Sequence, residues 1–151
     1  MDQIVLKIAR LAVCLTAAVS LTACMTTAMN KMTPEGKAFY EKAKVHPTSF
    51  MICKDQGADV WGRAQSFISE HSSVKLQTTT DYVIETYNPQ YGYGYKVTKA
   101  PSGQEFKITV NCLSGDFLNH LRAEDNAHIL AHYLKTGELP PDGVVNMSVM
   151  P

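Results

Sequence analysis

The sequence has no excess of charge of either sign. Its 151 residues hold 14 Lys and Arg against 14 Asp and Glu, so the formal net charge is +0. A protein that binds nucleic acid needs a basic surface that neutralises phosphates. The balanced charge therefore argues against a nucleic-acid partner.

Motifs of several enzyme classes are also missing. The sequence contains no Gly-rich phosphate loop, no GxSxG elbow and no Cys-His set that would place a nucleophile beside a base. The run Thr78-Thr79-Thr80-Asp81 supplies hydroxyls and an acid but no base, so it is more typical of a capped turn. We predict that the protein is not an enzyme and that it needs no cofactor.

The longest uncharged run is too short for a comfortable membrane span. Residues 11–23 (LAVCLTAAVSLTA) would extend roughly 20 Å as a helix, whereas a spanning helix needs about 20 apolar residues. Lys7 and Arg10 precede the run and small residues end it. This order is typical of a secretory signal, and we predict that residues 1–23 are removed.

The end of this run is more specific. Leu21-Thr22-Ala23-Cys24 resembles the lipobox of bacterial prolipoproteins, in which a Leu and two small residues precede a cysteine. The resemblance covers only residues 1–24. It implies a diacylglyceryl group on the Cys24 thiol, cleavage before Cys24, and a mature chain held in the lipid bilayer by acyl chains. Met25 in place of an Asp implies, by the sorting rule of that class, the outer membrane with the domain facing the periplasm.

The sequence contains four cysteines. Cys14 lies in the predicted signal and Cys24 is assigned to the lipid, which leaves Cys53 and Cys112. An even pair in an exported domain favours a disulfide, which would stabilise the fold by roughly 4 kcal/mol in the chain-entropy model. Two free thiols and a metal-binding pair are the alternatives.

The remaining sequence predicts one domain. Residues 24–32 are small and mostly polar, so they are interpreted as a lipidated tether. Residues 33–138 form the predicted domain, and residues 139–151, which include Pro140-Pro141, are predicted to be an extended tail.

Helix signals occur at three places. Thr33-Pro34-Glu35 is a typical helix start, and His46-Pro47 ends that helix. Apolar residues at helical spacing predict a second helix over 58–71. A third is predicted over 117–136, with Gly137 as its stop.

Between the second and third helices the apolar period changes to two. Four strands are predicted, over 74–78, 82–87, 95–99 and 106–112. The last two form a predicted hairpin whose connection contains Pro101 and Gly103. The sequence thus predicts an α+β domain with an antiparallel four-stranded meander, two helices before it and one after it, all packed on one face.

A tyrosine-rich segment is the first candidate site. Tyr87, Tyr91, Tyr93 and Tyr95 lie among Gly, Asn and Pro residues between two predicted strands. Tyrosine offers a large contact area and a hydroxyl with little entropy to lose. We predict an exposed loop that binds an envelope protein or peptidoglycan sugar rings, the alternative being a long loop whose tyrosines pack on the sheet.

The third predicted helix carries a second candidate. His120, Glu124, His128 and His132 recur at every fourth position and share one helix face. Two such histidines can bind zinc, but the catalytic Glu of an HExxH motif is missing because position 129 is Ile129.

These observations favour a membrane-anchored, non-enzymatic envelope lipoprotein whose small domain binds a protein or cell-wall partner. The alternative is an envelope metal-binding protein or hydrolase that uses the face of His120, His128 and His132.

Overall fold

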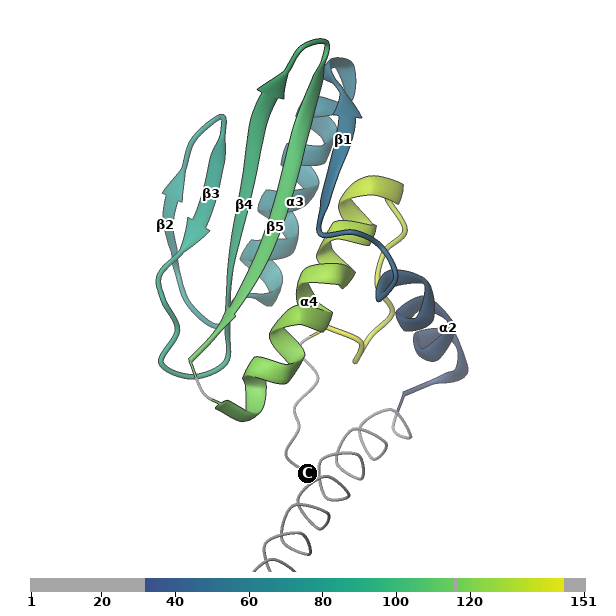
Figure 1. Cartoon of the computed structure of the whole chain (residues 1–151). Coiled ribbons are helices and arrows are strands. Elements are labelled where there is room, and N and C mark those ends of the chain that lie inside the picture. Colours follow the sequence, from purple (N-terminus) through teal and green to yellow (C-terminus); the bar gives the residue numbers. More distant parts are fainter. Residues whose placement is uncertain (1–31, 116, 146–151) are drawn as a thin grey trace, which may run out of the picture.

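The computed structural model describes residues 32–115 and 117–145, without the side chains of 117–121. In order, the elements are α2 (Pro34–Ala43), β1 (Ser49–Cys53), a 3-10 turn η1 (Lys54–Gln56), α3 (Gly57–His71), β2 (Leu76–Thr79), β3 (Val83–Thr86), β4 (Tyr93–Ser102), β5 (Glu105–Ser114) and α4 (Phe117–Thr136) (Figure 1). The predicted signal, Cys24 and residues 25–31 lie outside the described residues.

The strands form one antiparallel sheet in the order β1-β5-β4-β3-β2. The α+β class and the meander from β2 to β5 are confirmed, but the predicted number of four strands is wrong. A fifth strand, β1, pairs with β5 and places Phe50 opposite Ile108. The sequence interpretation missed it because the strand is short and its partner lies far along the chain.

The connection between β4 and β5 is shorter than predicted. Pro101 and Ser102 still belong to β4, so Gly103 and Gln104 alone make the turn. Gly103 has φ 58, the left-handed conformation that two-residue hairpin turns need at their first position. Pro101 is tolerated because β3 pairs with β4 only up to Thr98, so no ladder hydrogen bond on that side is lost.

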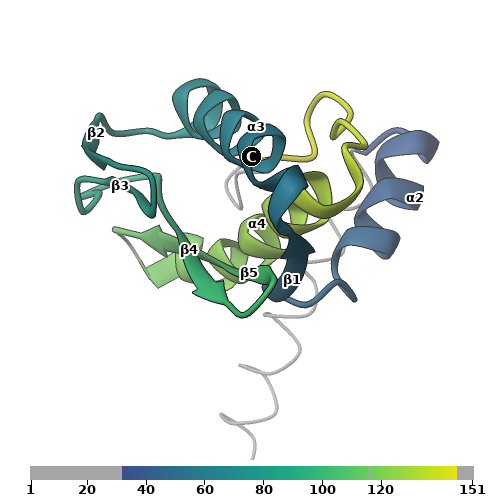
Figure 2. The same ribbon diagram turned by 90° about the horizontal axis from the view of Figure 1, so that it is seen from above.

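The buried side chains of the sheet lie on one face, where Ile84, Val97 and Val110 pair across three strands with at most 1% exposed. Helices supply the rest of the core on this face (Figure 2). The Phe67 ring of α3 lies 5.7 Å from Tyr95 on β4 and 6.0 Å from Tyr133 on α4, measured between ring centroids. Phe67 thus joins the sheet to both long helices.

Helix α2 begins as predicted and packs on α4. The Thr33 hydroxyl accepts a hydrogen bond from the Gly36 N–H at 3.1 Å, which caps the helix start. At the other end of the helix, the Tyr40 hydroxyl donates to Asp125 on α4 at 2.9 Å. These contacts make α2 part of the folded domain.

The chain beyond α4 also packs against the domain. Gly137 has φ 78 and its N–H donates to the Tyr133 carbonyl at 2.8 Å, which confirms the predicted helix stop. Val144 is fully buried beside Gly36 of α2. The described part of the predicted tail, residues 139–145, therefore continues the packed structure past residue 138.

Candidate functional site

The four candidate tyrosines separate into two pairs. Tyr93 and Tyr95 lie on β4 with 3% and 0% of their surface exposed, whereas Tyr87 and Tyr91 in the β3–β4 connection are 54% and 79% exposed. The prediction is therefore corrected for Tyr93 and Tyr95, which are core residues and are closed to a partner. Their alternation with glycine looked like a loop, but β4 begins two residues earlier than predicted.

The loop that carries the exposed Tyr87 and Tyr91 is fixed by hydrogen bonds at both ends. The Tyr87 N–H donates to the Lys75 carbonyl at 3.1 Å. Ser73 closes the other end, because its N–H donates to the Tyr93 carbonyl at 2.9 Å and its hydroxyl accepts from the Tyr93 N–H at 3.0 Å. Gly92 has φ 72 and lies directly against the Ser73 side chain. The loop of residues 87–92 is therefore fixed to the segment that follows α3.

The predicted disulfide is wrong, because both Cys53 and Cys112 are free thiols. Cys53 pairs with Glu105 at the start of β5, and Cys112 lies seven residues further along that strand. At ~3.4 Å per residue this separation is about 24 Å, whereas a disulfide needs Cα atoms within about 7 Å. Burial raises the pKa of the Cys112 thiol to about 12, so this thiol stays protonated and unreactive near neutral pH.

The histidines of α4 make contacts inside the protein. The His128 Nδ1 hydrogen-bonds the His46 carbonyl, and the His132 Nε2 lies 3.2 Å from a Glu138 carboxylate oxygen. Within residues 32–115 and 117–145, no group of three or more His, Cys, Asp or Glu side chains could hold a metal ion. The His120 side chain lies outside the described residues. The metal-binding alternative thus finds no ligand set in the described part of the chain.

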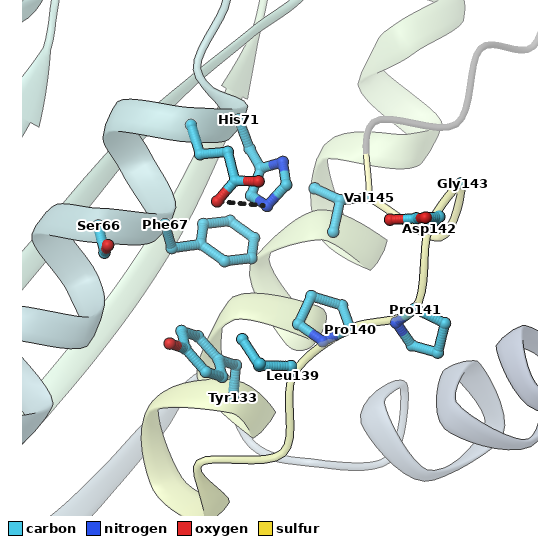
Figure 3. Close-up of a pocket in the computed structure, with 11 residues that line it drawn as sticks. Ser66, Phe67, His71, Tyr133, Leu139, Pro140, Pro141, Asp142, Gly143 and Val145 are labelled. Atoms are coloured by element: carbon cyan, nitrogen blue, oxygen red, sulfur yellow. Dashed lines mark ion pairs between the residues drawn. The ribbon is translucent and has the colours of Figure 1, made fainter.

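A cavity that the sequence did not suggest lies between α3, α4 and residues 139–145 (Figure 3). Its volume is about 450 Å³, and its apolar walls include Phe67, Tyr133 and Leu139. The α3 part of the lining lies about 60 residues before Tyr133 and the residues that follow α4, so no local motif marks the site. The size is within the range of small-ligand sites, which is about 300–1,000 Å³.

The charged part of the lining is acidic. Glu70 on α3 and Asp142 on the C-terminal segment both line the cavity, and no Lys or Arg does so among the described residues. The His71 ring lies 4.5 Å from the Phe67 ring, and its Nε2 is 4.0 Å from a Glu70 oxygen. Burial lowers the pKa of His71 below 6.5, although Glu70 acts in the opposite direction. The imidazole is therefore neutral at pH 7, and the cavity carries negative charge.

No protein-family model matches the chain, and no curated protein or solved structure matches it either. Across the described ranges, no helix combines the length and the apolar character needed to cross a membrane.

Proposed function

We propose that this chain is a membrane-anchored, non-enzymatic envelope lipoprotein whose domain binds a protein or cell-wall partner through the loop of residues 87–92. The observation that carries the proposal is the exposure of Tyr91 and Tyr87, 79% and 54%, on a loop whose two ends are hydrogen-bonded to the segment after α3. A loop that is already ordered loses little entropy on binding. Aromatic side chains on such a loop supply a large contact area.

The anchor is supported by the resemblance of Leu21-Thr22-Ala23-Cys24 to a lipobox. Two or three acyl chains on Cys24 would hold the protein durably, whereas one chain gives marginal binding. The eight residue steps from Cys24 to Met32 span at most about 28 Å when fully extended. The domain would therefore stay close to the bilayer surface, and Met25 favours the outer membrane.

Labelling tests the anchor. In cells given radiolabelled palmitate, the wild-type chain should carry label and sediment with membranes, and globomycin should make the precursor accumulate. Cys24→Ser should abolish the label, whereas the matched control Cys14→Ser, inside the predicted signal, should not. A Cys24→Ser chain that still matures and sediments normally would contradict the anchor.

Cross-linking in the intact envelope tests the partner surface. The Tyr87→Ala, Tyr91→Ala double variant should lose about tenfold of its cross-linked product, because removal of two contacting aromatic side chains costs at least ~1.4 kcal/mol of binding. Tyr82→Ala is the matched control, since Tyr82 is 53% exposed but lies between β2 and β3. Equal loss in both variants, or none in either, would contradict the assignment of the loop.

A pull-down with purified peptidoglycan separates the two partner classes. Retention of the wild-type chain on this material, and its loss in the double variant, would identify sugar rings as the partner. Cross-links to an envelope protein without retention on peptidoglycan would identify a protein partner.

A further inference from the structure

We infer that the cavity between α3, α4 and residues 139–145 is a second binding site, which takes a lysine or arginine side chain of a peptide. This inference depends neither on the lipid anchor nor on the tyrosine loop, because it uses different residues.

The apolar walls suit the hydrocarbon stem of such a side chain. Phe67 and Tyr133 contribute rings from two helices, and Leu139, at the third wall, leaves 72% of its surface exposed (Figure 3). Lysine and arginine bury their stems against apolar surface while their charged ends stay near polar groups. Aromatic faces add a favourable cation–π interaction with a positive charge.

Rigidity of the third wall favours binding as well. Pro140 and Pro141 follow Leu139, and each proline fixes its own φ. Val144 anchors the end of this segment in the core and its N–H donates to the Pro141 carbonyl at 3.2 Å. The wall is therefore ordered before any ligand arrives, so little entropy is lost on binding.

Charge selects the sign of the ligand. Glu70 and Asp142 line the cavity from two different elements, α3 and the C-terminal segment. Arg63, about two turns before Glu70 on α3, is outside the lining and donates to the Leu134 carbonyl at 2.9 Å. An ammonium or guanidinium group is thus attracted, and a carboxylate ligand is repelled.

His71 does not oppose this selection at neutral pH. Its half-buried ring packs on Phe67 and is uncharged there, for the reason given above. A bare metal ion would gain nothing from the aromatic and proline walls, and an apolar ligand would gain nothing from the two carboxylates. A cationic side chain with an apolar stem uses both parts of the lining.

Calorimetric titration of the full mature chain in detergent micelles tests the inference. The probe is the peptide acetyl-Ala-Leu-Lys-Leu-Ala-amide, and the matched control peptide has Glu in place of Lys. We expect saturable binding of the Lys peptide and at least about tenfold weaker binding of the Glu peptide, with weaker binding of the Lys peptide at high salt. Equal affinity for both peptides, or no binding of the Lys peptide at millimolar concentration, would overturn the inference.

Variants locate the binding. Glu70→Gln combined with Asp142→Asn should weaken the Lys peptide about five- to tenfold, since both exposed carboxylates are replaced by neutral amides of similar shape. Asp55→Asn combined with Glu105→Gln makes the same change of charge at exposed positions outside the lining and should leave the affinity unchanged. Equal effects of the two double variants would overturn the site.

Two further titrations separate this inference from binding of a small amine and from the proposal about the tyrosine loop. Butylammonium alone should bind at least about tenfold more weakly than the Lys peptide, because it lacks the flanking apolar contacts. If butylammonium bound as tightly as the Lys peptide, the ligand would be a small amine and the assignment of a peptide side chain would be overturned. The Tyr87→Ala, Tyr91→Ala variant should bind the Lys peptide like wild type, so failure of the loop proposal and failure of the cavity inference give different results.

Discussion

The segment from Tyr87 to Tyr95 contains two regions of similar composition and opposite environment. In the loop region, Tyr87 and Tyr91 expose more than half of their surface, whereas Tyr93 and Tyr95 in the strand region expose at most 3%. Gly92 separates the two regions, with φ 72. The difference teaches that the position of a tyrosine in the sheet register, and not its residue type, decides whether it stabilises the fold or stays open to a partner.

The largest effect is expected in the strand region. Tyr95→Ala should lower the free energy of unfolding by about 3–5 kcal/mol, because it removes a fully buried ring that contacts Phe67. Urea denaturation measures the change. Tyr95→Phe, which keeps the ring, is the control and should cost about 1 kcal/mol. A loss below about 1 kcal/mol for Tyr95→Ala would remove the energetic contrast between the two regions.

The second-largest loss of stability is expected at Gly92, which lies between the loop region and the strand region. Gly92→Ala should cost about 1–3 kcal/mol, because a side chain at φ 72 is strained and its Cβ would collide with Ser73. Gly103→Ala is the matched control: its φ is 58, but no atom lies within 4 Å of the added Cβ, so it should cost about 1 kcal/mol. Thermal denaturation compares the two variants. Equal losses of stability would show that the Ser73 side chain moves away from the added Cβ without a measurable energetic penalty.

Acid should lower the stability of the fold through His71, which lies near the buried strand region. His71 packs on Phe67, which contacts Tyr95, and burial lowers the pKa of His71 from 6.5. Because the unfolded chain binds this proton more readily, the contribution to stability is complete above pH 6.5 and is lost as pH falls toward the folded-state pKa. Urea denaturation at pH 7.5, 6.5 and 5.5 measures it. His71→Asn should show a smaller decline on acidification, and identical declines would contradict this role of His71.

The smallest effect is expected in the loop region. Tyr91→Ala should change the free energy of unfolding by no more than about 0.5 kcal/mol, because the side chain is 79% exposed. Urea denaturation of the purified domain gives the value. A loss above about 1 kcal/mol would mean that Tyr91 supports the fold, and its exposure would then carry no argument for partner binding.

Local signals predicted most of the fold. The Thr33-Pro34 start of α2, the apolar spacing of α3 and the Gly137 stop of α4 depend on residues within a few positions of each other, and all three are confirmed. The alternation of β2 to β5 is equally local. Strand β1 was missed because its pairing with β5 joins positions about 60 residues apart, such as Ser49 and Thr109.

The candidate site was less accessible to sequence reasoning. The exposed tyrosines were found by their residue type, but the same signal included two core residues. The cavity was not predicted, because Phe67, Tyr133 and Asp142 meet only after α3 and α4 have packed together. Similarly, parity and compartment favoured a disulfide that the register of β1 on β5 rules out.

The sequence by itself determined where helices begin and end, where the apolar period changes, and the resemblance of Leu21-Thr22-Ala23-Cys24 to a lipobox. These features depend on backbone preferences and side chains that act over a few residues. Only the tertiary structure decided which tyrosines are buried, how far Cys53 lies from Cys112, and that an acidic cavity exists. Each of these depends on strand register or helix packing, which brings together residues that no local pattern relates.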